Sequence, residues 1–253
     1  MSVKTGEIYK VGSHIVACGD CRDRDFVPIV IGERKVRAVI TDPPYGVAYV
    51  ENKKHIAGVS KDKEIKGDHT QSEKEYSKFT KDWITPVLPK LSEYNTFHIF
   101  NSDLMFLSLR KGMRDAGVRF TQMLIWLKNR AVMGRMDYLP QQELIAYGWY
   151  GKHKFERSKA KSLLIHPRPN KSSLHPTQKP IGLLRRLILN VTKHDEVVYD
   201  PFLGSGSTAV AASQLSRACI GIEIEPEYVE VSMKRLEKLL GITRELIDTY
   251  EAR

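Results

Sequence analysis

Two short stretches of the sequence place acidic side chains beside rigid or glycine-rich turns. The first is Asp42-Pro43-Pro44-Tyr45, which directly follows the apolar run VRAVI. Proline fixes φ and has no backbone N–H, so a Pro-Pro pair ends a strand and stiffens the turn after it. We therefore expect the carboxylate of Asp42 and the ring of Tyr45 to be held at the tip of a buried strand. An ordinary strand-ending turn fits these residues as well.

The second stretch, DPFLGSGSTA, begins at Asp200 and predicts a nucleoside-binding turn. Gly204 and Gly206 allow the backbone to turn sharply and to approach a ligand at the start of a helix. Glu223 lies at the tip of the next predicted strand, where a carboxylate binds ribose hydroxyls in nucleotide-binding α/β folds. The glycine spacing also fits a dinucleotide, but Asp200 would repel a pyrophosphate. A positively charged nucleoside without phosphates, S-adenosylmethionine, is therefore favoured over NAD; a purely structural turn is the alternative.

Strand-like runs alternate with helical stretches along the chain, and these elements must position both motifs. Strands are predicted near 14–18, 36–40, 96–100, 122–127, 143–147, 197–200 and 219–223. Ser72 and Glu75 form a capping box that predicts the start of one helix. Further amphipathic helices are predicted in SDLMFLSLRKGMRDAG, IGLLRRLILNV and PEYVEVSMKRLEKLL. This alternation predicts a mostly parallel sheet covered by helices on both faces.

The composition limits the class of protein and of partner. The 253 residues are 42% hydrophobic and 28% charged, with a net charge of +10. Residues 151–171 hold seven Lys or Arg and one acid, which suggests either a polyanionic partner or a solvated loop. No run approaches the ~18 apolar residues of a membrane span, and the polar start is unlike a signal peptide, so a bacterial-type cytoplasmic enzyme is expected. Cys18 and Cys21 have no second pair to complete a metal site, and none is expected.

Taken together, the motifs resemble the amino-methylating DNA methyltransferases, which act on adenine N6 or cytosine N4. DPPY precedes DPFLGSGST, which is the order of the β group of that family. HPTQKP (175–180) is similar to the motif that helps to hold the methionine end of the cofactor, and ACGDC (17–21) to the segment near its adenine. FHIFNSD (97–103), IWLK (125–128) and QELIAYG (142–148) fall where the family has the strands that line the target-base pocket.

The resemblance implies a Rossmann-like class I methyltransferase fold, which is an α/β fold with a seven-stranded, mostly parallel sheet ending in an antiparallel hairpin. We expect one domain over 1–253, with a mobile loop at 51–71 and a basic target-recognition segment at about 148–178. The implied residues for S-adenosylmethionine are Asp20, Cys21, Asp42, Lys179, Asp200, Phe202, Gly204, Ser205, Gly206, Ser207, Thr208 and Glu223. Lys179 is expected to reach the cofactor carboxylate, whereas Phe202 fits a core position equally well. The residues expected to contact double-stranded DNA are Lys152, Lys154, Arg157, Lys159, Lys161, Arg168 and Lys171.

In an enzyme of this family, Asp42, Pro43, Pro44 and Tyr45 are the catalytic residues. An exocyclic aromatic amine is a poor nucleophile, and its protons must be held while the nitrogen changes hybridisation. Asp42 can accept one N–H bond and the carbonyl of Pro43 another, in a geometry that the proline pair fixes. Tyr45 offers a stacking face for a base flipped out of the duplex. Transfer is then a direct displacement without a covalent enzyme intermediate.

Several alternatives remain open from the sequence. Asp before Pro-Pro-Tyr favours adenine, since cytosine-N4 enzymes more often carry Ser there. RNA and protein-glutamine methyltransferases usually carry Asn and place the cofactor motif upstream. A basic DNA-binding protein with an inactive site is opposed by the intact acidic residues. The resemblance does not decide the recognition sequence, whether a restriction endonuclease partner exists, or whether the chain forms a homodimer.

Overall fold

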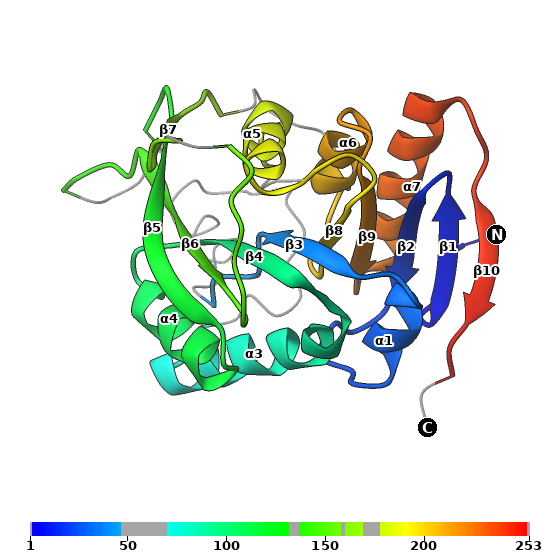
Figure 1. Cartoon of the computed structure of the whole chain (residues 1–253), viewed down its shortest axis with the longest axis horizontal. Coiled ribbons are helices and arrows are strands. Elements are labelled where there is room, and N and C mark those ends of the chain that lie inside the picture. The colour runs from blue at the N-terminus through cyan, green and yellow to red at the C-terminus, as the bar shows by residue number, and fades with distance from the viewer. Residues whose placement is uncertain (1, 47–69, 132–136, 158–159, 169–177, 252–253) are drawn as a thin grey trace, which may run out of the picture.

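The computed structural model describes residues 2–46, 70–131, 137–157, 160–168 and 178–251. Within them, ten strands form one sheet in the order β10-β1-β2-β9-β8-β3-β4-β6-β5-β7 (Figure 1). Five central neighbours, β2, β9, β8, β3 and β4, run parallel, and β6 is antiparallel to both β4 and β5. The strands are β1 (Glu7–Val11), β2 (His14–Cys18), β3 (Val36–Thr41), β4 (Leu91–Asn101), β5 (Arg119–Leu127), β6 (Gln142–Trp149), β7 (Leu163–Ile165), β8 (Val197–Asp200), β9 (Ala218–Glu223) and β10 (Glu245–Thr249).

The predicted α/β class and the antiparallel hairpin are confirmed, and all seven predicted strands are present. The sheet is wider than predicted, because β1 and β10 extend it at one end and β7 at the other. β10 is exposed along its whole length, and β7 has only three residues. Neither strand carries the long apolar run by which a buried strand is recognised in a sequence.

Helices cover both faces of the sheet (Figure 1). On one face lie α1 (Phe26–Ile31), α3 (Glu73–Ile84), the 3-10 helix η1 (Thr85–Lys90) and α4 (Phe106–Asp115), whose apolar side chains share one buried cluster with the sheet. On the other face lie α5 (Ile181–Val191), α6 (Ser207–Ser213) and α7 (Pro226–Leu240), which share a second cluster. The sheet is therefore apolar on both faces, as expected for a parallel sheet.

The start of α3 is fixed by the predicted capping box. The Ser72 hydroxyl accepts from the backbone N–H of Glu75 at 3.3 Å, and the Glu75 carboxylate accepts from the backbone N–H of Ser72 at 2.8 Å. Two large side chains on the buried face of this helix, Tyr76 and Trp83, are fully buried. The helix thus anchors the chain just after the DPPY turn, where Gln71 N–H donates to the carbonyl of Gly46 at 3.0 Å.

Strand direction determines which residues can meet. The five parallel strands end at one edge of the sheet, here called the carboxyl edge, and ligands bind at this edge in open α/β folds. β3 ends at Thr41, β8 at Asp200 and β9 at Glu223. Because β6 runs the other way, its first residues reach the same edge, where Leu144 pairs with Asn101 at the end of β4. Both motifs that the sequence singled out therefore emerge at the carboxyl edge.

Two predicted features lie partly or wholly outside the described residues. The loop predicted at 51–71 is described only at its last two residues, and the segment predicted at 148–178 is described at 148–157, 160–168 and 178. That the chain is a single domain with these two additional segments stays a prediction. None of the helices in the described ranges has the length and apolar character needed to span a bilayer.

Candidate active site

The DPPY turn leaves β3 at the carboxyl edge and holds its acid and its aromatic side chain together. The Tyr45 hydroxyl donates to Oδ1 of Asp42 at 2.7 Å. Burial raises the pKa of the Tyr45 hydroxyl well above its ordinary value, and the nearby Asp42 and Glu143 carboxylates raise it further. The hydroxyl therefore stays protonated and can only serve as a donor toward these acids. The sequence had suggested only a stacking role for this ring.

Lys179 joins the DPPY turn from just before α5. Its ammonium donates to Oδ2 of Asp42 at 2.5 Å and lies 3.2 Å from Oε2 of Glu143. Only 8% of the Lys179 side chain is exposed. Burial alone would lower the pKa of Lys179, but Asp42 and Glu143 raise it above the ordinary value, so the side chain is a cation. The lysine predicted to reach the cofactor carboxylate thus contacts the catalytic motif in this structure.

Glu143 and Lys128 complete this cluster, although neither residue belongs to a motif that predicts a role for it alone. Glu143 lies near the start of β6 and Lys128 directly after β5, and Nζ of Lys128 is 2.8 Å from Oε1 of Glu143. Oε2 of Glu143 also accepts from the Tyr45 hydroxyl at 3.2 Å. The only signal in the sequence was their place at the ends of two strands assigned to the target-base pocket. Neither spacing nor composition shows that these ends meet.

The pKa values of the two carboxylates in the cluster are shifted in opposite directions. Burial raises the pKa of Asp42, with Lys179 acting against this shift and the negative charge of Glu143 adding to it. Burial would also raise the pKa of Glu143, but Lys179 and Lys128 together bring it below its ordinary value. Two cations and two anions are therefore packed at the end of β3 with a balanced charge.

Asp200 is the last residue of β8, directly before the glycine turn, and its carboxylate holds the turn in place. Its Oδ1 accepts from the Thr41 hydroxyl at 2.6 Å and from the backbone N–H of Phe202 at 3.1 Å. The residue is only 3% exposed. Burial raises the pKa of Asp200 to about 6, although hydrogen bonds from Thr208 and Thr41 act in the other direction. Asp200 thereby ties the end of β8 to the end of β3, which carries the DPPY turn.

Glu223 holds the other side of the same turn. Its Oε2 accepts from the backbone N–H of Gly204 at 2.8 Å, and its Oε1 accepts from that of Glu225 at 2.9 Å. Burial raises the pKa of Glu223 to about 7, against the effect of these hydrogen bonds. Within the described residues, no Lys or Arg forms an ion pair with Asp200 or Glu223. Two buried acids thus flank the turn, and no cation of the described chain balances them.

The backbone of the turn requires glycine. Gly204 has φ of 51° and Gly206 has φ of 80°, both in the left-handed region. A Cβ at Gly206 would lie 2.8 Å from Cβ of Ser232 on α7. Arg235, also on α7, donates to the carbonyl of Ser205 and lies 3.2 Å from its hydroxyl. The next two predicted positions, Ser207 and Thr208, open α6 and are buried.

The remaining predicted cofactor positions lie around this turn. The backbone N–H of Gly19 donates to the carbonyl of Glu223 at 2.9 Å, which brings the segment with Asp20 and Cys21 beside β9. Asp20 is paired with Arg22 at 2.6 Å, and burial raises the pKa of the Cys21 thiol well above its ordinary value. Phe202 packs against Phe79 and Trp83, with ring centroids 5.8 Å and 5.5 Å away, and it is only partly buried.

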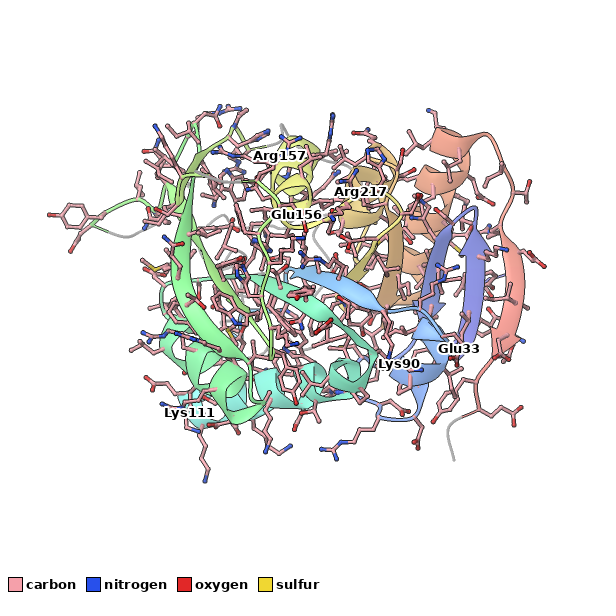
Figure 2. The ribbon with its side chains drawn as sticks, viewed as in Figure 1. Glu33, Lys90, Lys111, Glu156, Arg157 and Arg217 are labelled. Carbon is pink, nitrogen blue, oxygen red and sulfur yellow. The ribbon has the colours of Figure 1, made fainter. Side chains whose placement is uncertain are left out.

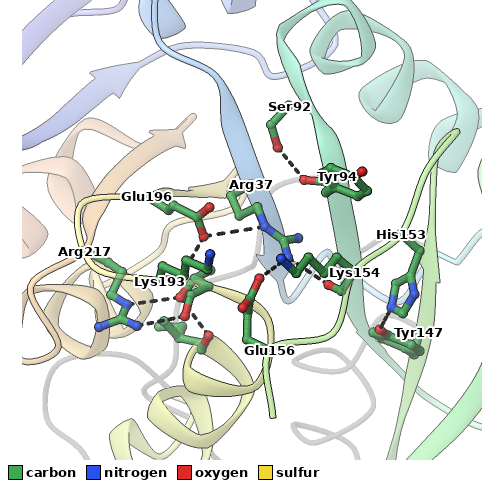
Figure 3. A network of polar contacts seen from close by, with 12 residues as sticks. Arg37, Ser92, Tyr94, Tyr147, His153, Lys154, Glu156, Lys193, Glu196 and Arg217 are labelled. Carbon is green, nitrogen blue, oxygen red and sulfur yellow. Dashed lines mark hydrogen bonds and ion pairs between the residues drawn. The ribbon is translucent and has the colours of Figure 1, made fainter. Parts of the chain in front are cut away.

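One part of the basic segment lies at the carboxyl edge. Another part lies at the opposite edge, where the parallel strands begin. The segment's first part lies at this opposite edge, where the guanidinium of Arg37, at the start of β3, donates to the carbonyl of Lys154 at 2.8 Å (Figure 3). Nζ of Lys152 is 2.5 Å from Glu93, near the start of β4. Glu156 and Arg157 lie together with Arg217 beyond the end of α5, where they line a shared hollow (Figure 2).

The later part of the segment returns to the carboxyl edge. The backbone N–H of His166 donates to the carbonyl of Leu127, and that of Arg168 donates to Oδ1 of Asn129, each at 3.1 Å. Lys161 precedes β7, which pairs with β5 and runs toward the same edge. Lys159 and Lys171 lie outside the described residues. Of the seven predicted DNA contacts, the structure therefore brings Arg168 and the strand after Lys161 toward Asp42, and places Lys152, Lys154 and Arg157 away from it.

Comparison with known proteins agrees with this architecture. The solved structure titled as the M1.HpyAVI–SAM complex is 26% identical, has a TM-score of 0.63, and is matched over 87% of this chain and 98% of its own. The cytosine-N4-specific PvuII DNA methyltransferase has a TM-score of 0.68 at 17% identity over 89% of each chain, which is a likeness of fold alone.

Sequence relatives carry methyltransferase names. The Type II methyltransferase M.HpaI of Haemophilus parainfluenzae is 27% identical over 232 residues, which are 81% of this chain and 69% of the relative. The Type II methyltransferase M2.MboI of Moraxella bovis is 47% identical over 70 residues, only 28% of this chain and 26% of the relative. The family described as DNA methylase matches residues 36–234, a span that runs from β3 into α7 and includes the whole cluster. The chain therefore belongs to the DNA methylase family of N6 and N4 amino-methylating enzymes, as its motifs had indicated.

Proposed function

We propose that the chain transfers the methyl group of S-adenosylmethionine to the exocyclic N6 amine of adenine in double-stranded DNA. The observation that carries this proposal is the joining of two turns at one edge: Thr41, the residue before Asp42, donates to Asp200, which holds the glycine turn. An acceptor for an amine and a nucleoside-binding turn are thus adjacent, as transfer between two ligands requires.

The glycine turn and its acids fit S-adenosylmethionine. Gly204 and Gly206 adopt positive φ. Because glycine has no side chain, the backbone at these positions can approach a ligand closely. The raised pKa values of Asp200 and Glu223 mark buried acids that a cationic ligand would favour in their ionised form. When bound, the cofactor would supply an electrophilic methyl group on a sulfonium. Glu223 would hold the ribose, with Asp20 and Cys21 beside the adenine, and Lys179 would face the methionine end from its place on Asp42.

The DPPY turn supplies the groups that act on the base. The Asp42 carboxylate accepts one N–H of the target amine and the carbonyl of Pro43 accepts the other, while Pro44 presents no competing N–H. Holding both protons lets the nitrogen lone pair turn toward the methyl group. The ring of Tyr45 stacks on the extruded base. No residue becomes covalently attached to the base in this scheme.

The DNA partner is supported by the basic segment. Arg168 and Lys161 are the members best placed to meet phosphates beside a base bound at Asp42, because the chain around them returns to the carboxyl edge. The names of the relatives also suggest a Type II restriction-modification setting, with an endonuclease of matching specificity as partner. DNA as substrate would place the enzyme in the cytoplasm of a bacterium or of a phage-infected cell. A homodimer is a further expectation from the family.

The test is direct product analysis. Purified protein is incubated with labelled S-adenosylmethionine and unmethylated DNA, and the DNA is then digested to nucleosides and separated by mass. The proposal predicts N6-methyladenine. N4-methylcytosine would move the enzyme to the sister activity without changing the site. Label in RNA or protein, and none in DNA, would contradict the proposed substrate.

A further inference from the structure

We propose that Glu143 is a positioning residue for the reaction: it holds the Tyr45 hydroxyl and the Lys179 ammonium in place while the Asp42 carboxylate receives the amine of the target base. The inference rests on the proposed function, since it concerns the same site. It adds a residue and a step that the DPPY motif alone does not contain.

The geometry shows two donors shared by two acids. The Tyr45 hydroxyl is 2.7 Å from Asp42 and 3.2 Å from Glu143. The Lys179 ammonium is 2.5 Å from Asp42 and 3.2 Å from Glu143. Each donor therefore already has a second acceptor within reach, on the same oxygen, Oε2 of Glu143.

The Asp42 carboxylate has limited room to accept a further hydrogen bond. Its Oδ1 is occupied by Tyr45 and its Oδ2 by Lys179 before any base arrives. An ionised carboxylate offers about four lone-pair sites, but their directions are limited. The target amine must take one of these directions in the correct orientation. The Tyr45 hydroxyl and the Lys179 ammonium must then move slightly away from Asp42.

Lys179 cannot give up its partner freely. A buried ammonium without a hydrogen-bonding anion is strongly disfavoured, and only 8% of this side chain is exposed. Glu143 lets Lys179 and Tyr45 shift by a small distance and remain paired. The Asp42 carboxylate is thereby made available to the amine without leaving an unpaired charge in the site.

Lys128 keeps Glu143 in position and ionised. Its ammonium is 2.8 Å from Oε1 of Glu143, which leaves Oε2 for the shared donors. The peptide groups of Lys128 and Gln141 hold the two strand ends together, with the Lys128 N–H donating to the Gln141 carbonyl at 2.8 Å. The lowered pKa of Glu143 agrees with an acid held between two cations.

The decisive variant is Glu143→Gln, which keeps the shape and removes the charge. Lys179 would then be drawn wholly to Asp42 and would compete with the amine. We expect single-turnover methyl transfer to fall about ten- to hundredfold, the range seen when a reacting group loses its alignment. Affinity for S-adenosylmethionine, measured by calorimetry, should change by less than about threefold, since Lys179 keeps its contact with Asp42 in this variant.

The pH profile separates positioning from a merely structural role. The charged and titratable groups that face Asp42 are Lys179, Glu143, Tyr45 and Asp200. Asp42 must be ionised to accept the amine, so activity is lost as pH falls through its pKa. Because the negative charge of Glu143 raises that pKa, the acid limb of single-turnover transfer should move to lower pH in Glu143→Gln. A loss of stability alone would not move it in this direction.

Two controls make the result interpretable. Glu156→Gln removes an acid of similar exposure, 16% against 18%, that pairs with a buried cation at the opposite edge; it should transfer methyl groups at the wild-type rate. Lys128→Met combined with Glu143→Gln restores the charge balance if the single variant does not fold, and it should still be slow. Tyr45→Phe combined with Glu143→Gln should cost less than the product of the single effects, because both act on one contact.

The outcomes distinguish this inference from the proposed function. If the wild-type enzyme methylates DNA and Glu143→Gln does so equally fast with an unmoved acid limb, only the role of Glu143 is wrong. Additive effects of Tyr45→Phe and Glu143→Gln would also contradict it. If the wild-type enzyme transfers no methyl group to DNA under any condition, the proposed function itself fails.

Discussion

Glu223 accepts a hydrogen bond from the backbone N–H of Gly204 at 2.8 Å, which joins the tip of β9 to the glycine turn after β8. This contact gives the carboxylate two tasks, since it would shape the turn and also face the ribose of a bound nucleoside. Burial raises its pKa to about 7 and that of Asp200 to about 6. Titration of these acids therefore falls in an accessible pH range.

Cofactor affinity should rise with pH. A cationic ligand that hydrogen-bonds to the acids favours their ionised forms, so binding releases protons at a pH near or below their pKa values. We expect the dissociation constant for S-adenosylmethionine to fall as pH rises from about 5.5 to 8, and calorimetry in buffers of different ionisation enthalpy should detect the proton release. Glu223→Gln should bind about ten- to a hundredfold more weakly at pH 8 and with a flatter pH dependence. Binding that is equally tight across this range would contradict the role of these acids.

Stability without ligand should change in the opposite sense. The ordinary pKa values are 3.8 for Asp200 and 4.5 for Glu223, and both are raised in the folded protein. Their contribution to the free energy of unfolding is therefore fully present below about pH 4 and is lost as pH rises through about 6 and 7. In thermal melts, the Tm of Glu223→Gln relative to wild type should increase between pH 5 and pH 8. A Tm difference that is constant with pH would mean that Glu223 is not protonated in the folded protein.

DNA binding should depend on which part of the basic segment is neutralised. Lys161→Ala with Arg168→Ala removes two charges from the part of the segment that runs toward the edge with Asp42, whereas Lys152→Ala with Lys154→Ala removes two at the opposite edge. We expect the first pair to reduce the salt slope of DNA affinity by about 0.9 for each phosphate that is no longer neutralised, and the second pair to leave the slope nearly unchanged. Equal slopes for both double variants would show that the two edges contribute alike.

The anchoring of the first part of this segment can be tested through Arg37. Its guanidinium lies 3.4 Å from Glu156 and 3.5 Å from Glu196, besides its bond to the carbonyl of Lys154. Arg37→Met leaves these partners without their cation, and we expect a loss of about 2–3 kcal/mol in the free energy of unfolding, since the acids are partly exposed. Urea unfolding measures this loss. A variant as stable as wild type would mean that the segment is held by other contacts.

Tyr45 should tolerate the loss of its hydroxyl better than the loss of its ring. Tyr45→Ala removes a stacking face worth about 1–3 kcal/mol as well as the bonds to Asp42 and Glu143. Tyr45→Phe removes only the hydroxyl bonds, so it should keep measurable activity. Single-turnover rates on the same DNA decide the order, and a Phe variant as inactive as the Ala variant would assign the main role to the hydroxyl.

Much of the fold was predictable because it is encoded locally. Most of the seven predicted strands contain buried apolar runs, although β5 is largely exposed or half-buried. The start of α3 is set by the neighbouring pair Ser72 and Glu75. β10 was not predictable in this way, because its residues ELIDT are exposed and owe their strand form to pairing with β1, far away in the sequence.

The site was predictable where a motif is contiguous and not where it is assembled by topology. Asp42, Tyr45 and the glycine turn follow from short patterns. The meeting of Lys128 with Glu143, and of Lys179 with Asp42 across 137 residues, depends on which strand ends share an edge. Spacing carries no record of that order, so the contact between Lys179 and Asp42 was not predicted and Glu143 was not selected.

The proposed mechanism requires that Asp42 acts on the target amine and not on the cofactor. The sharpest test compares wild type with Asp42→Ala in two assays on the same preparations: calorimetry with S-adenosylmethionine, and mass analysis of nucleosides from DNA incubated with it. We expect N6-methyladenine from the wild type, none from Asp42→Ala, and nearly equal cofactor affinity for both. Full methylation of DNA by Asp42→Ala would contradict the mechanism.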